Sequence, residues 1–117
     1  MWQILILDDV LDWLDHLDTR SKAQVFVALE LLEQKGPNLG RPLVDSIIGS
    51  SIKNLKELRP GSAGSTELRI LFVFDPQRNA VLLVAGDKSK DFVRWYRRNI
   101  PLAEARYETY LKGSESE

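Results

Sequence analysis

The sequence predicts a single α+β domain: an antiparallel-rich sheet of about four strands, an N-terminal helical hairpin on one face of it, and a C-terminal helix. Three observations lead to this fold class. The chain has 117 residues, a length that suits one hydrophobic core. The first third has apolar residues at helical spacing, and residues 55–85 hold three β-rich runs joined by short turns. We therefore expect one domain over residues 1–112 and a flexible tail over 113–117.

The N-terminal third begins with a strand and continues into a helix. Residues 2–7 form a short apolar run, which is most easily a strand. Apolar side chains then recur at positions i, i+3, i+4 and i+7, namely Val10, Trp13, Leu14 and Leu17. Aspartates lie near the start of this segment, where the helix dipole favours negative charge.

A second helix follows at once. Asp18 or Thr19 can cap its N-terminus, and its buried stripe runs from Val25 to Leu32. Gly36, followed by a proline, ends it. We expect the two helices to pair as a hairpin, and we expect residues 36–54, rich in glycine and without a clear period, to be mostly loop.

Three strands then form an antiparallel meander. The runs 55–59, 68–74 and 80–85 are separated by small polar or proline-containing turns at 60–66 and 75–79. Such short connections exclude parallel pairing between these neighbours, because parallel strands need crossovers of about a dozen residues or more. With the hairpin on one face, we expect the other face to stay partly open and to display basic side chains.

The C-terminal segment is predicted to be helical in two parts. Residues 88–98 suit a short basic helix or an irregular turn. Pro101 suits the first turn of a last helix that reaches about Leu111, since proline is tolerated where no helical N–H is needed.

Composition excludes several functional classes. The chain has no cysteine, so it has no disulfide framework, zinc finger or thiol nucleophile. Its apolar runs are well short of a membrane span and no basic leader precedes one, so we expect a cytoplasmic protein. The net charge of −1 conceals an asymmetry, because residues 1–50 carry −4, residues 51–98 carry +5 and the last 19 carry −2. A local basic surface is therefore expected.

The usual catalytic sets are missing. His16, the one histidine, lies in an acidic helix, and we interpret it as a surface residue. The nearby aspartates are interpreted as a solvated face rather than as metal ligands. The glycine-containing turn at residues 61–65 lacks the lysine and the following helix of a phosphate-binding loop. We expect neither a cofactor nor a metal.

Cationic side chains remain as the candidate functional groups. Arg59 ends one predicted strand and Arg69 opens the strand that pairs with it, so the two lie about 5 Å apart if directly opposite. Two guanidiniums at that distance repel unless an anion bridges them. The bridging anion is either structural, such as Glu67 or Asp87, or a bound phosphate.

Several motifs, taken in order, resemble one known family. Residues 37–42, 54–59, 68–75 and 81–90 are similar to the RelE/ParE toxin superfamily, and most similar to its HigB-like, phage Gp49-like branch of type II toxin–antitoxin systems. The resemblance implies a RelE-like fold and a ribosome-dependent mRNA endoribonuclease, an mRNA interferase that uses metal-independent attack by the 2′-hydroxyl of the RNA. It also implies a helix-turn-helix, HigA-like antitoxin, contact with ribosome and mRNA, and contact with DNA only through the antitoxin.

The resemblance also implies a catalytic set. Arg59 and Arg69 match the phosphate-clamping arginines, Lys88 and Lys90 match the basic cluster after the last strand, and Tyr96 or its neighbour Trp95 is the aromatic that could stack on a base. Both aromatics could equally pack the last helix onto the sheet. The other RNA-binding candidates are all basic: Lys53, Lys56, Arg94, Arg97 and Arg98.

Two other functions stay open at this point. One is a non-enzymatic, ParE-like toxin that binds DNA gyrase. The other is a degenerate module that only binds its antitoxin.

Overall fold

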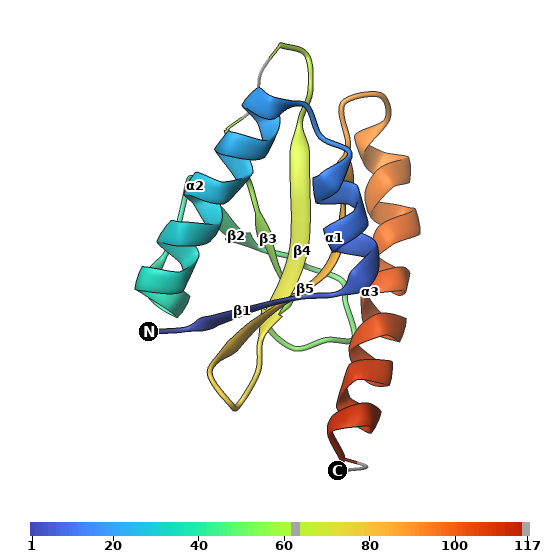
Figure 1. Ribbon diagram of the computed structural model, residues 1–117. Helices are drawn as coiled ribbons and strands as arrows, with labels where there is room; N and C mark the ends of the chain where they lie inside the picture. Colours follow the sequence, from blue (N-terminus) through green and yellow to red (C-terminus); the bar gives the residue numbers. More distant parts are fainter. Residues whose placement is uncertain (62–63, 116–117) are drawn as a thin grey trace.

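Helices cover both faces of a five-stranded sheet in the computed structural model, which describes residues 1–61 and 64–115 (Figure 1). The α+β class is therefore confirmed. The elements in chain order are β1 (Gln3–Ile6), α1 (Asp8–Asp15), α2 (Thr19–Lys35), the 3₁₀ helix η1 (Gly36–Asn38), β2 (Val44–Ser46), β3 (Lys56–Leu58), β4 (Leu68–Phe74), β5 (Asn79–Asp87) and α3 (Phe92–Glu115).

The sheet has the strand order β1-β5-β4-β3-β2. The predicted meander is confirmed, because β3 pairs antiparallel with β4 and β4 pairs antiparallel with β5. β1 is parallel to β5, and the hairpin and the other strands lie between the two in sequence. β1 and β2 are the edge strands, and both are short, which limits the backbone they leave unpaired.

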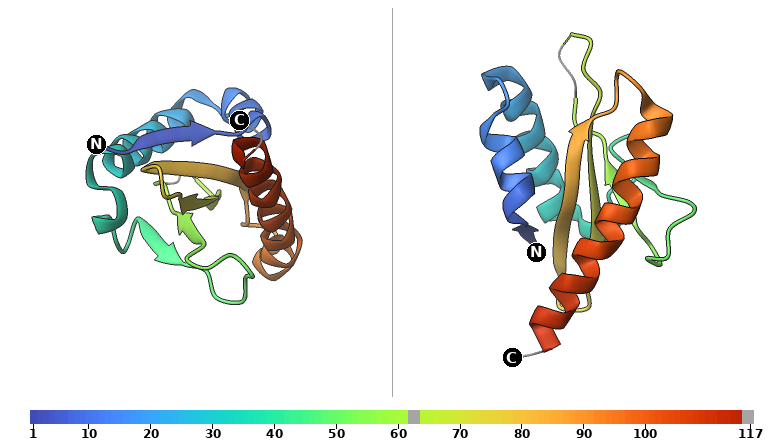
Figure 2. Two further views of the ribbon diagram at one scale, coloured as in Figure 1. Left: turned by 90° about the horizontal axis from the view of Figure 1, so that it is seen from below. Right: turned by 90° about the vertical axis from the view of Figure 1, so that its right-hand side faces the viewer.

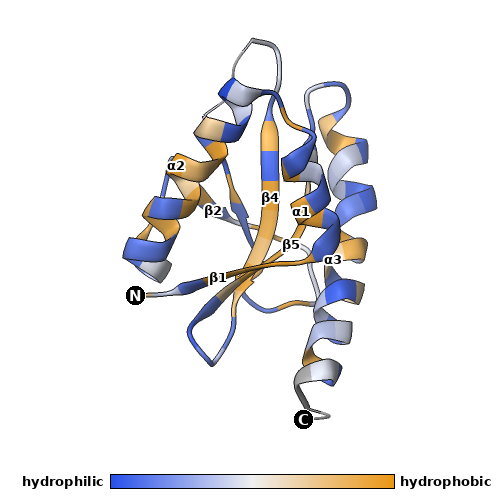
Figure 3. Cartoon of the chain, in the orientation of Figure 1, coloured by the Kyte–Doolittle hydropathy of each residue, from blue (hydrophilic) through white to orange (hydrophobic). Residues whose placement is uncertain are grey.

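Helices lie on both faces of the sheet (Figure 2), and one apolar cluster on each face holds them to it. Side chains alternate between faces along a strand, so Ile70 and Phe72 of β4 contact the hairpin while Leu71 and Val73 face α3. The central strand β4 is accordingly apolar along most of its length. Each helix carries apolar residues as well as polar ones, as the hydropathy colours show (Figure 3). The expectation of a partly open second face was wrong, because α3 packs along it.

Residues 36–54, expected to be mostly loop, contain β2 as well as η1, so the sheet has one strand more than predicted. A strand of three residues is too short to show a period of two. Its pairing with β3, which places Asp45 opposite Glu57, is a tertiary contact.

α3 is continuous from Phe92 to Glu115, so the division at Pro101 was wrong. Pro101 lies inside the helix, where it cannot donate to the carbonyl four residues earlier. The helix continues because its inner face, including Ile100 and Ala103, packs on the sheet. It also extends three residues into the expected tail, whose last two residues, 116 and 117, lie outside the described residues, as do 62 and 63 of the predicted turn.

Within the described ranges, no helix has the length and hydrophobicity needed to cross a membrane.

Candidate functional site

Arg59 and Arg69 meet at one end of the sheet, as the predicted hairpin required. β3 and β4 are paired with Leu58 opposite Ile70, so Arg59, one residue beyond β3, comes opposite Arg69 in β4. Strand alternation places Glu57 on the same face as Arg59. The two guanidiniums therefore share this face with a carboxylate.

Glu57 is the anion that bridges the two arginines. Its side chain is only 4% exposed, and its Oε2 accepts hydrogen bonds from Arg59 Nη2 at 3.0 Å and Arg59 Nε at 3.2 Å. Its Oε1 lies 3.6 Å from Arg69 Nε. A carboxylate this buried needs such partners, since an unpaired buried charge is strongly destabilising.

Neither of the two carboxylates that the sequence offered as examples of a structural anion, Glu67 and Asp87, bridges the arginines. Glu67 Oε1 is 3.8 Å from Arg69 Nη2 on an exposed side chain, so Glu67 is a secondary partner. Asp87 Oδ1 instead accepts from the backbone N–H groups of Glu67 and Ser89, both within 3.0 Å. The signal that could have identified Glu57 is its i−2 spacing from Arg59, which puts both side chains on one face of a strand.

The two arginines differ in their surroundings. Arg59 also donates to Asp45 Oδ2 at 3.1 Å, and its side chain is 33% exposed. Burial works against its charge, but hydrogen bonding and attraction from Glu57, with help from Asp45, raise the pKa of Arg59. Arg59 is therefore permanently cationic and partly open to solvent.

Arg69 is more buried and less satisfied. Its side chain is 13% exposed, and Nη1 donates to the carbonyl of Leu68 at 2.7 Å. Its buried Nε has no hydrogen-bond acceptor among the described residues. A buried donor left unpaired costs about 1–3 kcal/mol, and such groups in folded proteins call for an explanation. The cluster therefore has an unused donor next to the bridging carboxylate.

Tyr96 joins this cluster from α3. Its hydroxyl donates to Glu57 Oε1 at 2.5 Å, and its ring packs edge-on against Trp95 at a centroid distance of 5.1 Å. Burial and the hydrogen bond to Glu57 raise the pKa of Tyr96 to about 12. At neutral pH Tyr96 is thus a neutral phenol that donates a hydrogen bond.

Trp95 packs α3 against the sheet. This was one of the two alternatives left open for it, the other being stacking on an RNA base. Its indole lies over Gly86, which pairs with Arg69 across the β4–β5 ladder. A Cβ added at Gly86 would lie 2.6 Å from Trp95 Nε1, so only glycine allows this approach. The close contact sets the distance between α3 and the strands that carry the arginines.

Lys88 is the third basic residue at the site, after Arg59 and Arg69. Its Nζ lies 5.3 Å from the centroid of the Tyr96 ring and 5.7 Å from that of Phe92. No carboxylate of residues 1–61 or 64–115 forms an ion pair with it, in contrast to Arg59 and Arg69. Lys90 is exposed beyond Lys88. Lys88 therefore places an uncompensated positive charge beside Tyr96.

The other predicted RNA-binding residues do not join the cluster. Lys56 alternates to the opposite side of β3 from Glu57, with Nζ 3.4 Å from Ser46 Oγ. Arg94 forms an exposed ion pair with Asp91 at 3.6 Å, and the side chains of Arg97 and Arg98 are exposed on α3. The three α3 arginines lie within one helical turn of Trp95, on a different side of the helix, and form a basic rim there.

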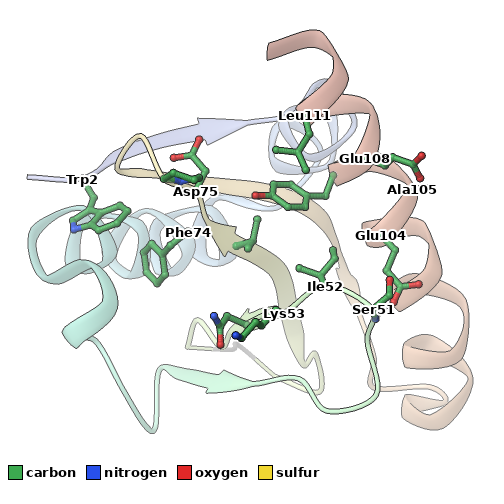
Figure 4. Close-up of a pocket in the computed structure, with 14 residues that line it drawn as sticks. Trp2, Ser51, Ile52, Lys53, Phe74, Asp75, Glu104, Ala105, Glu108 and Leu111 are labelled. Atoms are coloured by element: carbon green, nitrogen blue, oxygen red, sulfur yellow. Dashed lines mark hydrogen bonds between the residues drawn. The ribbon is translucent and has the colours of Figure 1, made fainter. Parts of the chain in front are cut away.

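Lys53 lies at the other end of the sheet from Arg59. It lines a cavity of about 890 Å³ between the 51–54 loop, the end of β4 and the C-terminal half of α3 (Figure 4). Much of the wall is apolar, with Trp2 and Phe74 in edge-to-face contact at 4.8 Å. Asp75, also in this wall, is held by Asn79 and Tyr110. The cavity is thus remote from the arginine cluster.

His16 is at the surface, at the end of α1, with its side chain 77% exposed. In the part of the chain that the structure describes, no three His, Cys, Asp or Glu side chains are grouped so that they could hold a metal ion.

Comparison with known proteins places the chain in a family. The family model for phage-derived Gp49-like proteins matches residues 12–108. The chain is 46% identical over 108 residues to the putative toxin HigB3 of Mycobacterium tuberculosis, a match that covers 92% of each protein. It is 50% identical over 99 residues to the putative toxin HigB2 of the same organism, covering 85% of this chain and 49% of HigB2, so it spans about half of that relative's length.

The fold has a solved counterpart. A free-state, arginine-substituted variant of the Escherichia coli toxin RelE superposes with a TM-score of 0.58 at 11% identity, over 80% of this chain and 90% of RelE. At this identity the likeness concerns the fold alone. Together with the sequence matches, it shows that this chain belongs to the Gp49-like family of HigB toxins and has a RelE-like fold.

Proposed function

We propose that the protein is the toxin of a type II toxin–antitoxin module and acts as a ribosome-dependent mRNA endoribonuclease. The observation that carries the proposal is the convergence of Arg59, Arg69 and Tyr96 on Glu57, with Lys88 beside them. Fixed cations directed at a phosphate suit RNA cleavage, because they stabilise the negative charge that develops in the reaction. The HigB relatives support the toxin role.

The proposed reaction uses the 2′-hydroxyl of the RNA as the nucleophile. The 2′-oxygen bonds to the adjacent phosphorus while the bond from phosphorus to the 5′-oxygen breaks, so a 2′,3′-cyclic phosphate and a free 5′-hydroxyl form. One proton leaves the 2′-hydroxyl, and one is delivered to the departing 5′-oxygen. Negative charge builds up on the non-bridging oxygens, where preorganised donors lower the barrier.

Each residue of the cluster has a role in this scheme. The guanidiniums of Arg59 and Arg69 bind the phosphate and stabilise its developing charge, and Arg59, at 33% exposed, is the more accessible of the two. The Lys88 ammonium supplies a proton to the departing 5′-oxygen and the proton of the 2′-hydroxyl passes to water, while the buried Glu57 carboxylate holds the two guanidiniums in place. Tyr96, with its pKa raised to about 12, holds Glu57 as a donor rather than acting as a base.

The remaining basic residues suit contacts with the RNA backbone. Lys90 and the α3 rim of Arg94, Arg97 and Arg98 are exposed at the same end of the molecule as Lys88. Binding to ribosomal or messenger phosphates would then weaken with added salt. As partners we propose a helix-turn-helix, HigA-like antitoxin together with the ribosome and mRNA, with DNA reached only through the antitoxin. Such a role places the protein in the cytoplasm.

Mapping mRNA ends in translating cells after induction tests the proposal. We expect cuts within ribosome-covered codons, and we expect Arg69→Ala to abolish them. Arg78→Ala is the matched control, because Arg78 contacts the Trp2 ring at the opposite end of the sheet and should leave cleavage unchanged. Intact message accompanied by gyrase-linked DNA breaks would overturn the nuclease assignment.

A further inference from the structure

Phe92 is an exposed aromatic residue at the edge of the arginine cluster. It opens α3, has 59% of its surface exposed, and lies one helical turn before Tyr96 on the same face. Lys88 Nζ lies near both rings, 5.7 Å from the centroid of Phe92 and 5.3 Å from that of Tyr96. A series of contacts therefore leads from the buried Glu57 through Tyr96 and Lys88 to Phe92 at the surface.

Tyr96 is poorly placed to hold a base itself. Its hydroxyl is committed to Glu57, an edge contact joins it to Trp95, and Lys88 lies over its ring. Lys88 Nζ approaches the Phe92 ring at a similar distance, so the two rings differ in burial rather than in this contact, and Tyr96 is the more buried of the two. Phe92 carries no hydrogen bond that stacking would break, and its ring is more open to solvent.

We propose that Phe92 and Lys88 form the nucleotide subsite of this protein, in which the Phe92 ring stacks on a base next to the scissile phosphate. An apolar aromatic face beside an unpaired ammonium matches the two parts of a nucleotide, a planar base and an anionic phosphate. The inference rests on the proposed nuclease function and refines it. Phe92 then determines which bases are accepted, while Tyr96 acts as a positioning residue for Glu57.

A fluorescent base analogue tests this subsite directly. Ribosomes are programmed with an mRNA that carries 2-aminopurine in the A-site codon and a 2′-deoxy sugar that blocks cleavage. Stacking on an aromatic ring quenches 2-aminopurine, so the wild-type protein should quench it and Phe92→Ala should not. Phe92→Trp should restore the quenching. Val93→Ala is the matched control, because Val93 is a neighbouring apolar residue of α3 with 54% exposure.

Cleavage of unmodified mRNA provides the second readout. Phe92→Ala should lower kcat/KM by about tenfold or more, the range expected for one lost base–aromatic contact, and should flatten the base preference of the cuts. If the wild type cleaves but Phe92→Ala quenches and selects bases as the wild type does, the subsite is wrong and the nuclease proposal stands. If the wild type neither quenches nor cleaves, both fail.

Discussion

The hydroxyl of Tyr96 donates a 2.5 Å hydrogen bond to the buried carboxylate of Glu57, and this bond ties α3 to β3 across 39 residues of sequence. The same carboxylate holds Arg59 and approaches Arg69. Removal of any member therefore leaves the others with unbalanced charge or unused donors.

Glu57→Ala should destabilise the fold by about 3 kcal/mol or more, because it leaves two partly buried guanidiniums without their shared anion. The side chains of Arg59 and Arg69 are 33% and 13% exposed, so water can compensate only part of the loss. Urea unfolding measures the change. Glu67→Ala, at a side chain that is 52% exposed, is the control and should cost about 1 kcal/mol or less. Equal losses for the two variants would contradict the bridging role of Glu57.

Tyr96→Phe should change how stability depends on alkaline pH. The folded state favours the neutral phenol, since the pKa of Tyr96 is raised to about 12. Its contribution to stability is therefore complete below the ordinary tyrosine pKa of about 10 and is lost as the pH rises towards 12. Unfolding free energies at pH 8, 10 and 11.5 should show this fall in the wild type and a weaker fall in Tyr96→Phe.

Tyr107→Phe serves as the comparison for that experiment. In the described part of the structure the Tyr107 hydroxyl has no hydrogen bond. Its pKa is nevertheless raised, mainly by burial and to a lesser extent by the negative charge of Asp75. Its removal should cost less at neutral pH than the removal of the Tyr96 hydroxyl, for which a charge-assisted bond of about 1.5–3 kcal/mol is expected. A larger cost for Tyr107→Phe would count against the Tyr96–Glu57 bond.

Asp75→Asn should make the stability of the fold less dependent on acidic pH than it is in the wild type. Asp75 accepts from the Gln77 and Asn79 backbone N–H groups, from Asn79 Nδ2 and from the Tyr110 hydroxyl, all within 3.0 Å. Burial disfavours its charge, but these donors outweigh burial and lower the pKa of Asp75. Its stabilisation is therefore present above the ordinary aspartate pKa of about 3.9 and is lost as the pH falls below it.

Urea unfolding at pH 7, 5 and 3 measures this effect. The Asp75→Asn variant should be less stable than the wild type at pH 7 and should change less between pH 5 and pH 3. Tyr110→Phe removes one of the donors and should give a smaller loss at pH 7. If Asp75→Asn keeps the full acid dependence, the loss comes from other carboxylates.

Gly86→Ala should weaken both stability and cleavage. The new Cβ would lie 2.6 Å from Trp95 Nε1, so the indole and the helix that carries it must shift. Overpacking of this kind costs about 1–3 kcal/mol. Because Tyr96 follows Trp95, cleavage should fall further than the loss of folded protein explains. Both are measured in one preparation, by urea unfolding and by mRNA cleavage.

Gly40→Ala is the matched control for Gly86→Ala. Apart from its two chain neighbours, no described residue has an atom within 4 Å of the Cβ that alanine would add, and Gly40 does not have a positive φ. The substitution should change neither stability nor cleavage measurably. If Gly86→Ala behaves in the same way, the close contact with Trp95 does not set the position of α3.

Much of the fold could be predicted from local patterns. The helical hairpin, the β4 run and the antiparallel meander follow from apolar periodicity and turn residues, which act over a few positions. β2 and the continuity of α3 through Pro101 could not be predicted this way. A strand of three residues has no measurable period, and a proline ends a helix unless packing holds it. The apolar cluster between α3 and the sheet, which includes Ile100 and Ala103, supplies that packing.

The sequence by itself determined the family resemblance and the apposition of Arg59 with Arg69, because a short hairpin must bring their strand ends together. Only the tertiary structure decided that Glu57 bridges them, that Tyr96 donates to it, and that Lys53 lies at the far cavity. The physical reason is that charge balance in a buried cluster depends on which side chains meet across β3, β4 and α3. These contacts depend on the pairing register of β3 with β4 and on the position of α3 over the sheet. Neither can be deduced from residues that are adjacent in the chain.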